Sequence, residues 1–201
     1  MKLNLFFKQA AFLFLMMFAL QGAWAANADA QKLIQDTIDQ VLAAIKENPD
    51  NAADVAKQYV LPNFDFLAMS RLVVGKNWKS ATAGQKKSFV QAFRDLLIRT
   101  YANTLTEAAA SEVGKVEIEY LPIRDKEGAK RVTVQTKVKY QGKSIKLDYA
   151  LRNKKGNWKV WNVTAGGVSL VTNYRAEFQK IHKEKGMDGL IEAVNKKNKG
   201  E

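Results

Sequence analysis

The stretch TAGGVSLVTNYRAEF, residues 164–178, comes nearest in composition to a site for phosphate chemistry. It follows the strand-like run NWKVWNV, and its adjacent glycines, Gly166 and Gly167, lead through Ser169 into a segment with helical spacing. A strand, a glycine turn and a helix are also the parts of a phosphate-binding loop. The stretch nevertheless lacks the G-x-x-x-x-G-K-[ST] pattern and follows an antiparallel meander. We therefore interpret it as a corner at which the glycines allow the bend and Ser169 caps the next helix.

The rest of the sequence offers little for catalysis. The chain has one histidine, His182 in a lysine-rich helical stretch, and no cysteine. There is no G-x-S-x-G motif and no group of residues with the spacing of zinc ligands. The acidic residues Asp65, Glu107, Asp148 and Glu177 are scattered over different elements, although a general acid–base pair could still be assembled from them in space. We expect no catalytic residue, no metal and no cofactor.

The first 25 residues have the features of a secretory signal peptide. Lys2 and Lys8 precede an unbroken apolar run over 10–20, and Ala23-Trp24-Ala25 fits a cleavage site. We therefore expect cleavage after Ala25, export, a single domain over 26–195 and a flexible basic tail over 196–201.

The full chain has 32 Lys and Arg against 20 Asp and Glu, a net charge of +12. Cleavage of the signal peptide would remove two lysines and no acidic residue and leave a net charge of +10. Such a charge suits binding to anionic membrane surfaces or acidic partners, whereas export argues against nucleic acid as the partner.

Periodicity predicts helices, then strands, then helices. Helical spacing covers 28–47 and about 50–60, Asp65 is a candidate cap for a short helix, and Thr82-Ala83-Gly84-Gln85 resembles a capping box. The period then changes to two, with apolar and polar residues alternating on one wet and one buried face. Helical spacing returns from Leu170 and is interrupted at Gly186. The sequence predicts an α+β fold in which N-terminal helices, a bent four-stranded antiparallel sheet and C-terminal helices enclose an apolar cavity. We expect the four strands at 115–120, 131–140, 145–152 and 158–163.

Aromatic and aliphatic residues converge on the faces between the predicted sheet and helices. Phe89 and Phe93 lie on one broad face of the helix that begins near residue 82, and Tyr174 and Phe178 follow on a later one. Ordinary core packing and a cavity for an apolar ligand both account for this pattern, and composition does not separate them.

Two segments resemble the MlaC/toluene-tolerance auxiliary family. LVVGKNWKSATAGQKKSFVQAFRDLLIRTYANTL (72–105) is similar to its G-x-x-W-x-x-A-x-x-x-Q-x-x-x-F-x-x-x-F signature. NWKVWNVTAGGVSLVTNYRAEFQKIHKEKGMDGLIEAV (157–194) resembles its closing segment, although Gly166 stands where members often carry an acid. The matching positions are Gly75, Trp78, Ala81, Gln85, Phe89, Phe93, Trp158, Asn162, Val163, Gly167, Val168, Ser169, Asn173, Tyr174, Arg175, Phe178, Gly186, Asp188, Gly189 and Leu190.

The resemblance implies a periplasmic phospholipid carrier without catalysis, on a fold like the cone of nuclear-transport-factor-2 with added helices. It implies exchange between an outer-membrane lipoprotein–porin complex and the substrate-binding subunit of an inner-membrane ABC transporter, which maintains outer-membrane lipid asymmetry. An enzyme or a protein-binding adaptor on the same fold is the alternative. As a hypothesis, the acyl chains contact Phe66, Phe93, Leu97, Tyr101, Val134, Val138, Leu147, Tyr149, Val160, Val168 and Tyr174.

Overall fold

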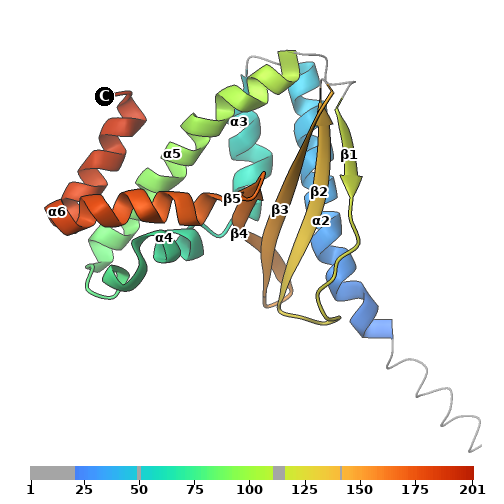
Figure 1. Ribbon diagram of the computed structural model, residues 1–201, viewed down its shortest axis with the longest axis horizontal. Helices are drawn as coiled ribbons and strands as arrows, with labels where there is room; N and C mark the ends of the chain where they lie inside the picture. Colours follow the sequence, from blue (N-terminus) through green and yellow to red (C-terminus); the bar gives the residue numbers. More distant parts are fainter. Residues whose placement is uncertain (1–20, 49–50, 111–115, 141) are drawn as a thin grey trace, which may run out of the picture.

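A computed structural model describes residues 21–48, 51–110, 116–140 and 142–201 (Figure 1). The chain forms helices, then an antiparallel sheet, then a long kinked helix, as the α+β prediction requires. Its α-helices are α2 (Gln21–Glu47), α3 (Ala52–Val55), α4 (Phe66–Val74), α5 (Ala83–Ala110) and α6 (Leu170–Lys199). A π-helical turn (Ala56–Val60) and two 3₁₀ turns (Leu61–Asn63 and Gly75–Trp78) connect the shorter ones.

The sheet is a simple meander. Its strands follow the order of the chain, and every neighbouring pair is antiparallel. It has five strands where the sequence predicts four, because two residues after the Gly166-Gly167 turn pair back onto the preceding strand. The strands are β1 (Glu117–Tyr120), β2 (Arg131–Tyr140), β3 (Lys143–Lys154), β4 (Asn157–Ala165) and β5 (Val168–Ser169).

The Gly166-Gly167 corner is a two-residue hairpin loop. Thr164 pairs with Ser169 and Ala165 with Val168, and both glycines have positive φ, 55° and 87°. Hairpin loops of this length favour positive φ at both positions, which glycine adopts without a steric penalty. The Ser169 hydroxyl then accepts a hydrogen bond from the backbone N–H of Thr172 at 3.2 Å. The predicted bend and the predicted cap are both confirmed.

The other predicted helix ends are also present. Asp65 caps α4 by accepting from the backbone N–H of Ala68 at 2.9 Å. Thr82 and Gln85 form the reciprocal capping box at the start of α5, with hydrogen bonds of 3.0 and 3.1 Å. Gly186, with φ of 67°, kinks α6 at the predicted interruption. Helix α6 continues to Lys199, further than the sequence predicts, since the segment from 196 was expected to be a tail.

Helices α4, α5 and α6 pack together beside the β4–β5 edge of the sheet and form what we call the helical core (Figure 1). Phe89, Phe93 and Phe178 lie at its centre with no exposed surface. The ring centroids of Phe89 and Phe178 are 5.8 Å apart and those of Phe93 and Phe178 are 5.7 Å apart, both edge to face. Most of the aromatic residues that the sequence places on one face of α5 are therefore packed inside the helical core.

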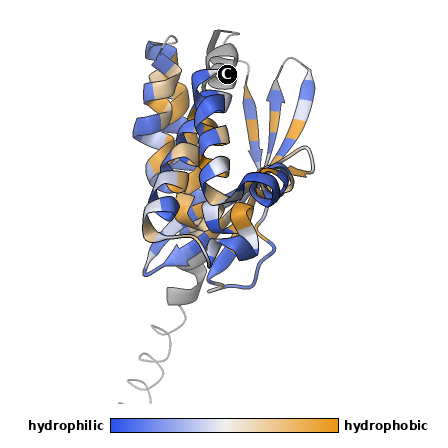
Figure 2. Ribbon diagram, turned by 90° about the vertical axis from the view of Figure 1, so that its left-hand side faces the viewer, coloured by the Kyte–Doolittle hydropathy of each residue, from blue (hydrophilic) through white to orange (hydrophobic). Residues whose placement is uncertain are grey.

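Helix α2 lies along the sheet and forms a second core with it. Ala30 and Ile34 pack against Val132, Val134 and Leu151, all of which are buried. Figure 2 shows apolar and polar residues alternating along the strands, which is the expected pattern for a sheet with one covered face. None of the helices in the described ranges is both long and apolar enough to cross a membrane.

Candidate functional site

One face of the sheet is mostly apolar. The strand register places Val138 opposite both Ile118 and Ile145, and Val134 opposite Tyr149. Because side chains alternate between faces, every second residue of each strand joins these on the same side. We call this side the apolar face; it comprises Ile118, Tyr120, Val132, Val134, Thr136, Val138, Ile145, Leu147, Tyr149, Leu151, Trp158, Val160 and Val163.

Burial falls from one end of the apolar face to the other. Val132 and Val134 are 2% and 0% exposed, whereas Ile145, beside the β2–β3 turn, is 50% exposed. Val138 and Leu147 are half-buried between these extremes. We call the region of Val138, Ile145 and Leu147 the uncovered end of the apolar face.

The covering helix explains the gradient. Helix α2 packs on the sheet as far as Ile38, but its last turns do not. There Val41 and Ile45 pack instead against Val55 and the half-buried Tyr59, on α3 and the turn after it. The apolar residues of α2 are therefore divided between two partners. The uncovered end is the part of the sheet that α2 leaves without a helical cover.

The candidate lipid-contact residues lie in two cores rather than around one cavity. Phe93, Leu97 and Tyr174 are buried in the helical core, and Phe66 is half-buried against it. Val134 and Val160 are buried between α2 and the sheet, where Tyr149 is half-buried. Val138 and Leu147 are at the uncovered end. Phe64 packs against both cores, stacks on Phe66 with centroids 5.9 Å apart, and marks where they meet.

The last two candidates are exposed. Tyr101 on α5 is 43% exposed. Val168 is 63% exposed beside the Gly166-Gly167 turn, so it lies at the surface and not in either core. In a two-residue hairpin that returns only one pair of residues, the first residue after the turn lies at the sheet edge.

Two tyrosines of the apolar face and one on α5 have raised pKa values. Partial burial, assisted by the neighbouring Tyr174, raises the pKa of Tyr101 to about 12. Burial, assisted by Asp39, also raises the pKa of Tyr120 to about 12. Burial also raises the pKa of Tyr149, and it outweighs a hydrogen bond with Thr136 that lowers this pKa. These phenols stay neutral at physiological pH, so they give this region hydroxyl groups without charge.

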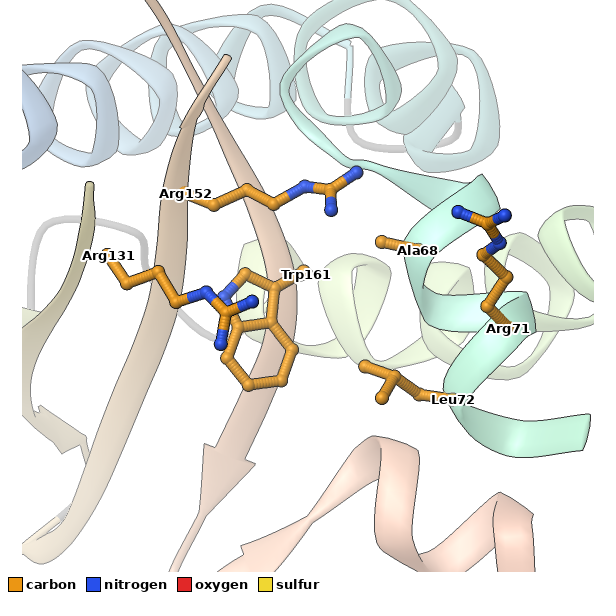
Figure 3. Close-up of a pocket in the computed structure, with 6 residues that line it drawn as sticks. All are labelled: Ala68, Arg71, Leu72, Arg131, Arg152 and Trp161. Atoms are coloured by element: carbon orange, nitrogen blue, oxygen red, sulfur yellow. The ribbon is translucent and has the colours of Figure 1, made fainter. Parts of the chain in front are cut away.

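The opposite face of the sheet carries a feature that sequence reasoning did not identify. A pocket of about 200 Å³ lies between this face and α4 (Figure 3). We call it the arginine pocket; its lining residues are Ala68, Arg71, Leu72, Arg131, Arg152 and Trp161. The available signal was the alternation that puts Arg131 and Arg152 on the polar face. The approach of α4, from a distant part of the sequence, could not be read from spacing.

Comparison with known proteins places the chain among bacterial lipid-binding proteins. The family model described as MlaC protein matches residues 29–196. The intermembrane phospholipid transport system binding protein MlaC of Haemophilus influenzae is 27% identical, over 81% of this chain and 75% of that protein. The toluene tolerance protein ttg2D of Pseudomonas putida is 26% identical, over 78% and 74%. The solved structure of a phospholipid-binding protein from Ralstonia solanacearum, in complex with a phospholipid, has a TM-score of 0.78 and 28% identity, over 85% and 97%.

Proposed function

Because the chain belongs to the MlaC family, we propose that it is a phospholipid carrier that shields acyl chains from water on the apolar face of its sheet. The similar proteins support this, since one is named for intermembrane phospholipid transport and another was solved with a phospholipid bound. The observation that carries the proposal for this chain is Ile145. It is a large aliphatic residue that is half exposed on a face whose other apolar residues are buried or half-buried.

The energetics require a protein of this kind. A diacyl phospholipid has roughly 30 methylene groups, and at about 0.8 kcal/mol each their exposure to water costs on the order of 25 kcal/mol. Free diffusion of the lipid through an aqueous compartment is therefore negligible. A carrier needs apolar walls and no reactive group, which fits a sheet face of valine, isoleucine, leucine and neutral tyrosine.

The acyl chains enter, in this proposal, at the uncovered end and lie between the apolar face and the helical core. Val138, Leu147 and Tyr149 form the sheet wall, with Val134 and Val160 below them. Tyr101, Leu97, Phe93, Phe66 and Tyr174 form the helix wall. The two walls meet at Phe64, which packs against both cores, so separating them there would open space for the chains. Val168, at the exposed turn, lies near the rim.

The finer aspects of the carrier function are part of the same proposal. We place the protein in the periplasm, with its signal peptide cleaved after Ala25 and no catalytic activity. Its partners would be the substrate-binding subunit of an inner-membrane ABC transporter and an outer-membrane lipoprotein–porin complex, with transient contact to the membrane surface. The net charge of +12, or +10 once the two lysines of the signal peptide are removed, supports docking on anionic surfaces. Docking of that kind weakens as salt is raised.

The test is the lipid content of the purified protein. Native mass spectrometry of protein prepared without added lipid should show a bound diacyl phospholipid. Ile145→Glu should lower the bound fraction about tenfold, because a carboxylate beside acyl chains has no partner there. The free energy of unfolding should change by no more than about 0.5 kcal/mol, since the side chain is half exposed.

Ser144→Glu is the matched control. It introduces the same charge one residue away, and alternation along β3 places it on the opposite face. The control should keep its lipid. Equal lipid content in both variants would refute the placement of the chains at the uncovered end. Absence of lipid from the unmodified protein would instead favour a protein-binding adaptor.

A further inference from the structure

The arginine pocket is separated from the proposed acyl-chain site by the sheet itself. Arg131 and Arg152 are register partners on β2 and β3, and their neighbours Val132 and Leu151 belong to the apolar face. Alternation therefore directs the two arginines to the other side. The third arginine, Arg71, comes from α4, which faces that side (Figure 3).

A β-bulge supplies the aromatic wall of the arginine pocket. Leu151 pairs with Val160 and Ala150 pairs with Asn162, so Trp161 is the extra residue on β4. A bulge re-aims the side chain at the point where pairing is interrupted. Trp161 consequently joins the two arginines on the polar side of the sheet, and its half-buried indole lines the pocket.

Asp65 fixes the position of one arginine. Its carboxylate accepts from Arg152 Nε at 2.9 Å and also contacts the Arg152 Nη2 nitrogen, while Lys154 Nζ lies 3.6 Å away. Asp65 is itself held by the backbone N–H of Ala68. The four cationic side chains here are Arg71, Arg131, Arg152 and Lys154, and Asp65 is the one carboxylate, so the local formal charge is +3.

The lining supplies donors and no free acceptor side chain. Arg71 and Arg131 form no ion pair with a carboxylate among the described residues. The buried Trp161 Nε1 likewise has no hydrogen-bond partner within the described ranges. A guanidinium group has only N–H donors. A pocket with several such groups and an already occupied carboxylate is complementary to an anion with several acceptor oxygens.

We infer that the arginine pocket binds a phosphate group, at a site distinct from the acyl-chain site. In Figure 3 the guanidinium groups of Arg71 and Arg131 lie on opposite sides of the pocket, with that of Arg152 between them. Long arginine side chains can turn so that all three donate to different oxygens of one phosphate, which suits a tetrahedral anion better than a single planar carboxylate. The volume of about 200 Å³ admits a small anion. Inorganic phosphate and the headgroup of a membrane phospholipid share this chemistry. Binding here does not depend on acyl chains and goes beyond the carrier function.

Trp161 provides the readout. Its indole N–H resonance, followed by nitrogen–proton NMR of the purified protein, should shift on addition of inorganic phosphate at neutral pH, where phosphate is an anion. Chloride at equal ionic strength should not reproduce the shift. The indole N–H of Trp158, which packs with α2 on the apolar face, is the internal reference and should not move.

Two variants test the arginines without disturbing Asp65. Arg71→Gln and Arg131→Gln should each weaken phosphate binding about tenfold, the loss of one charge-assisted hydrogen bond. Lys46→Gln removes the same charge from the exposed end of α2 and should leave binding unchanged. Neither arginine variant should alter the lipid content, which separates this inference from the carrier proposal. Unchanged phosphate affinity in both arginine variants, or no shift of Trp161, would overturn it.

Vesicles distinguish the two sources of phosphate. If phosphatidylglycerol vesicles broaden the Trp161 signal and inorganic phosphate reverses this, the ligand is a membrane headgroup. If inorganic phosphate shifts the signal and vesicles leave it unchanged, the ligand is a soluble phosphate. A hexaglutamate peptide that shifts the signal at lower concentrations than phosphate would refute the inference in favour of an acidic protein segment.

Discussion

The helical core and the apolar face of the sheet are built from similar side chains, but they are covered to different degrees. Phe89, Phe93 and Phe178 have no exposed surface and pack edge to face. On the sheet, burial declines along the strands until Ile145 is half exposed. The helical core is covered by three helices, whereas α2 covers one end of the sheet and turns its other apolar residues toward α3. Apolar residues that stabilise the fold thus lie beside apolar residues left available for a ligand.

Truncation in the two regions should therefore have unequal effects on stability. Phe93→Ala should lower the free energy of unfolding by about 3–5 kcal/mol, because the ring is fully buried and its removal leaves a cavity. Ile145→Ala, in delipidated protein, should cost no more than about 0.5 kcal/mol. Urea unfolding followed by circular dichroism measures both. Similar losses would show that the uncovered end is packed in solution as tightly as the helical core.

The contact that joins the two regions should have an intermediate effect. Asp65 caps α4 on the helical side and pairs with Arg152 on the sheet, with its side chain almost fully buried. Asp65→Asn should lower the free energy of unfolding by about 2 kcal/mol, because it removes the charge from a cap and from a largely buried ion pair. Glu119→Gln, which affects an exposed pair with Lys137, is the control and should change little.

The same pair should make stability depend on pH. Burial of Asp65 opposes ionisation, but the hydrogen bonds from Ala68 and Arg152 and the charges of Arg152 and Lys154 outweigh it, so its pKa lies below 3.8. This stabilisation is complete above the unfolded pKa and is lost as pH falls through the folded pKa. Urea unfolding at pH values from neutral to below 3.8 should show a loss that is smaller in Asp65→Asn. An identical acid dependence in both proteins would contradict the role of Asp65.

Local signals predicted much of the fold. The change of period from helical to two located the sheet, and the Asp65 cap, the Thr82–Gln85 box and the Gly166-Gly167 turn each proved to be where their residue types indicated. All of these depend on residues close in sequence. The two-residue β5 was missed because a strand that short has no period.

The division of the candidate site between two cores was not predictable in the same way. Phe93 and Val134 are both apolar residues on apolar faces, and spacing alone cannot show that one packs among helices and the other against α2. That difference arises from how distant elements share their surfaces. Burial also decides which residue tests the site. Trp in place of Leu97 would overpack a buried position of the helical core, whereas a change at Ile145 reports on the exposed wall.

The smallest expected effect concerns the two tyrosines of raised pKa. Tyr101 is on the proposed helix wall, whereas Tyr120 is on β1 and packs in the core that α2 covers. Because both pKa values are near 12 against 10 in the unfolded chain, their stabilisation is complete below pH 10 and is lost as pH rises toward 12.

Bound lipid should remove further water from Tyr101 and leave Tyr120 unaffected. The phenolate absorbance midpoint of Tyr101, obtained by subtracting the titration of Tyr101→Phe, should therefore be higher in lipid-loaded than in delipidated protein. The midpoint of Tyr120, obtained in the same way from Tyr120→Phe, is the reference. If lipid moved both midpoints equally, the change would reflect general tightening of the protein. If it moved neither, the acyl chains would not reach α5, and the ligand would be held by the sheet wall alone.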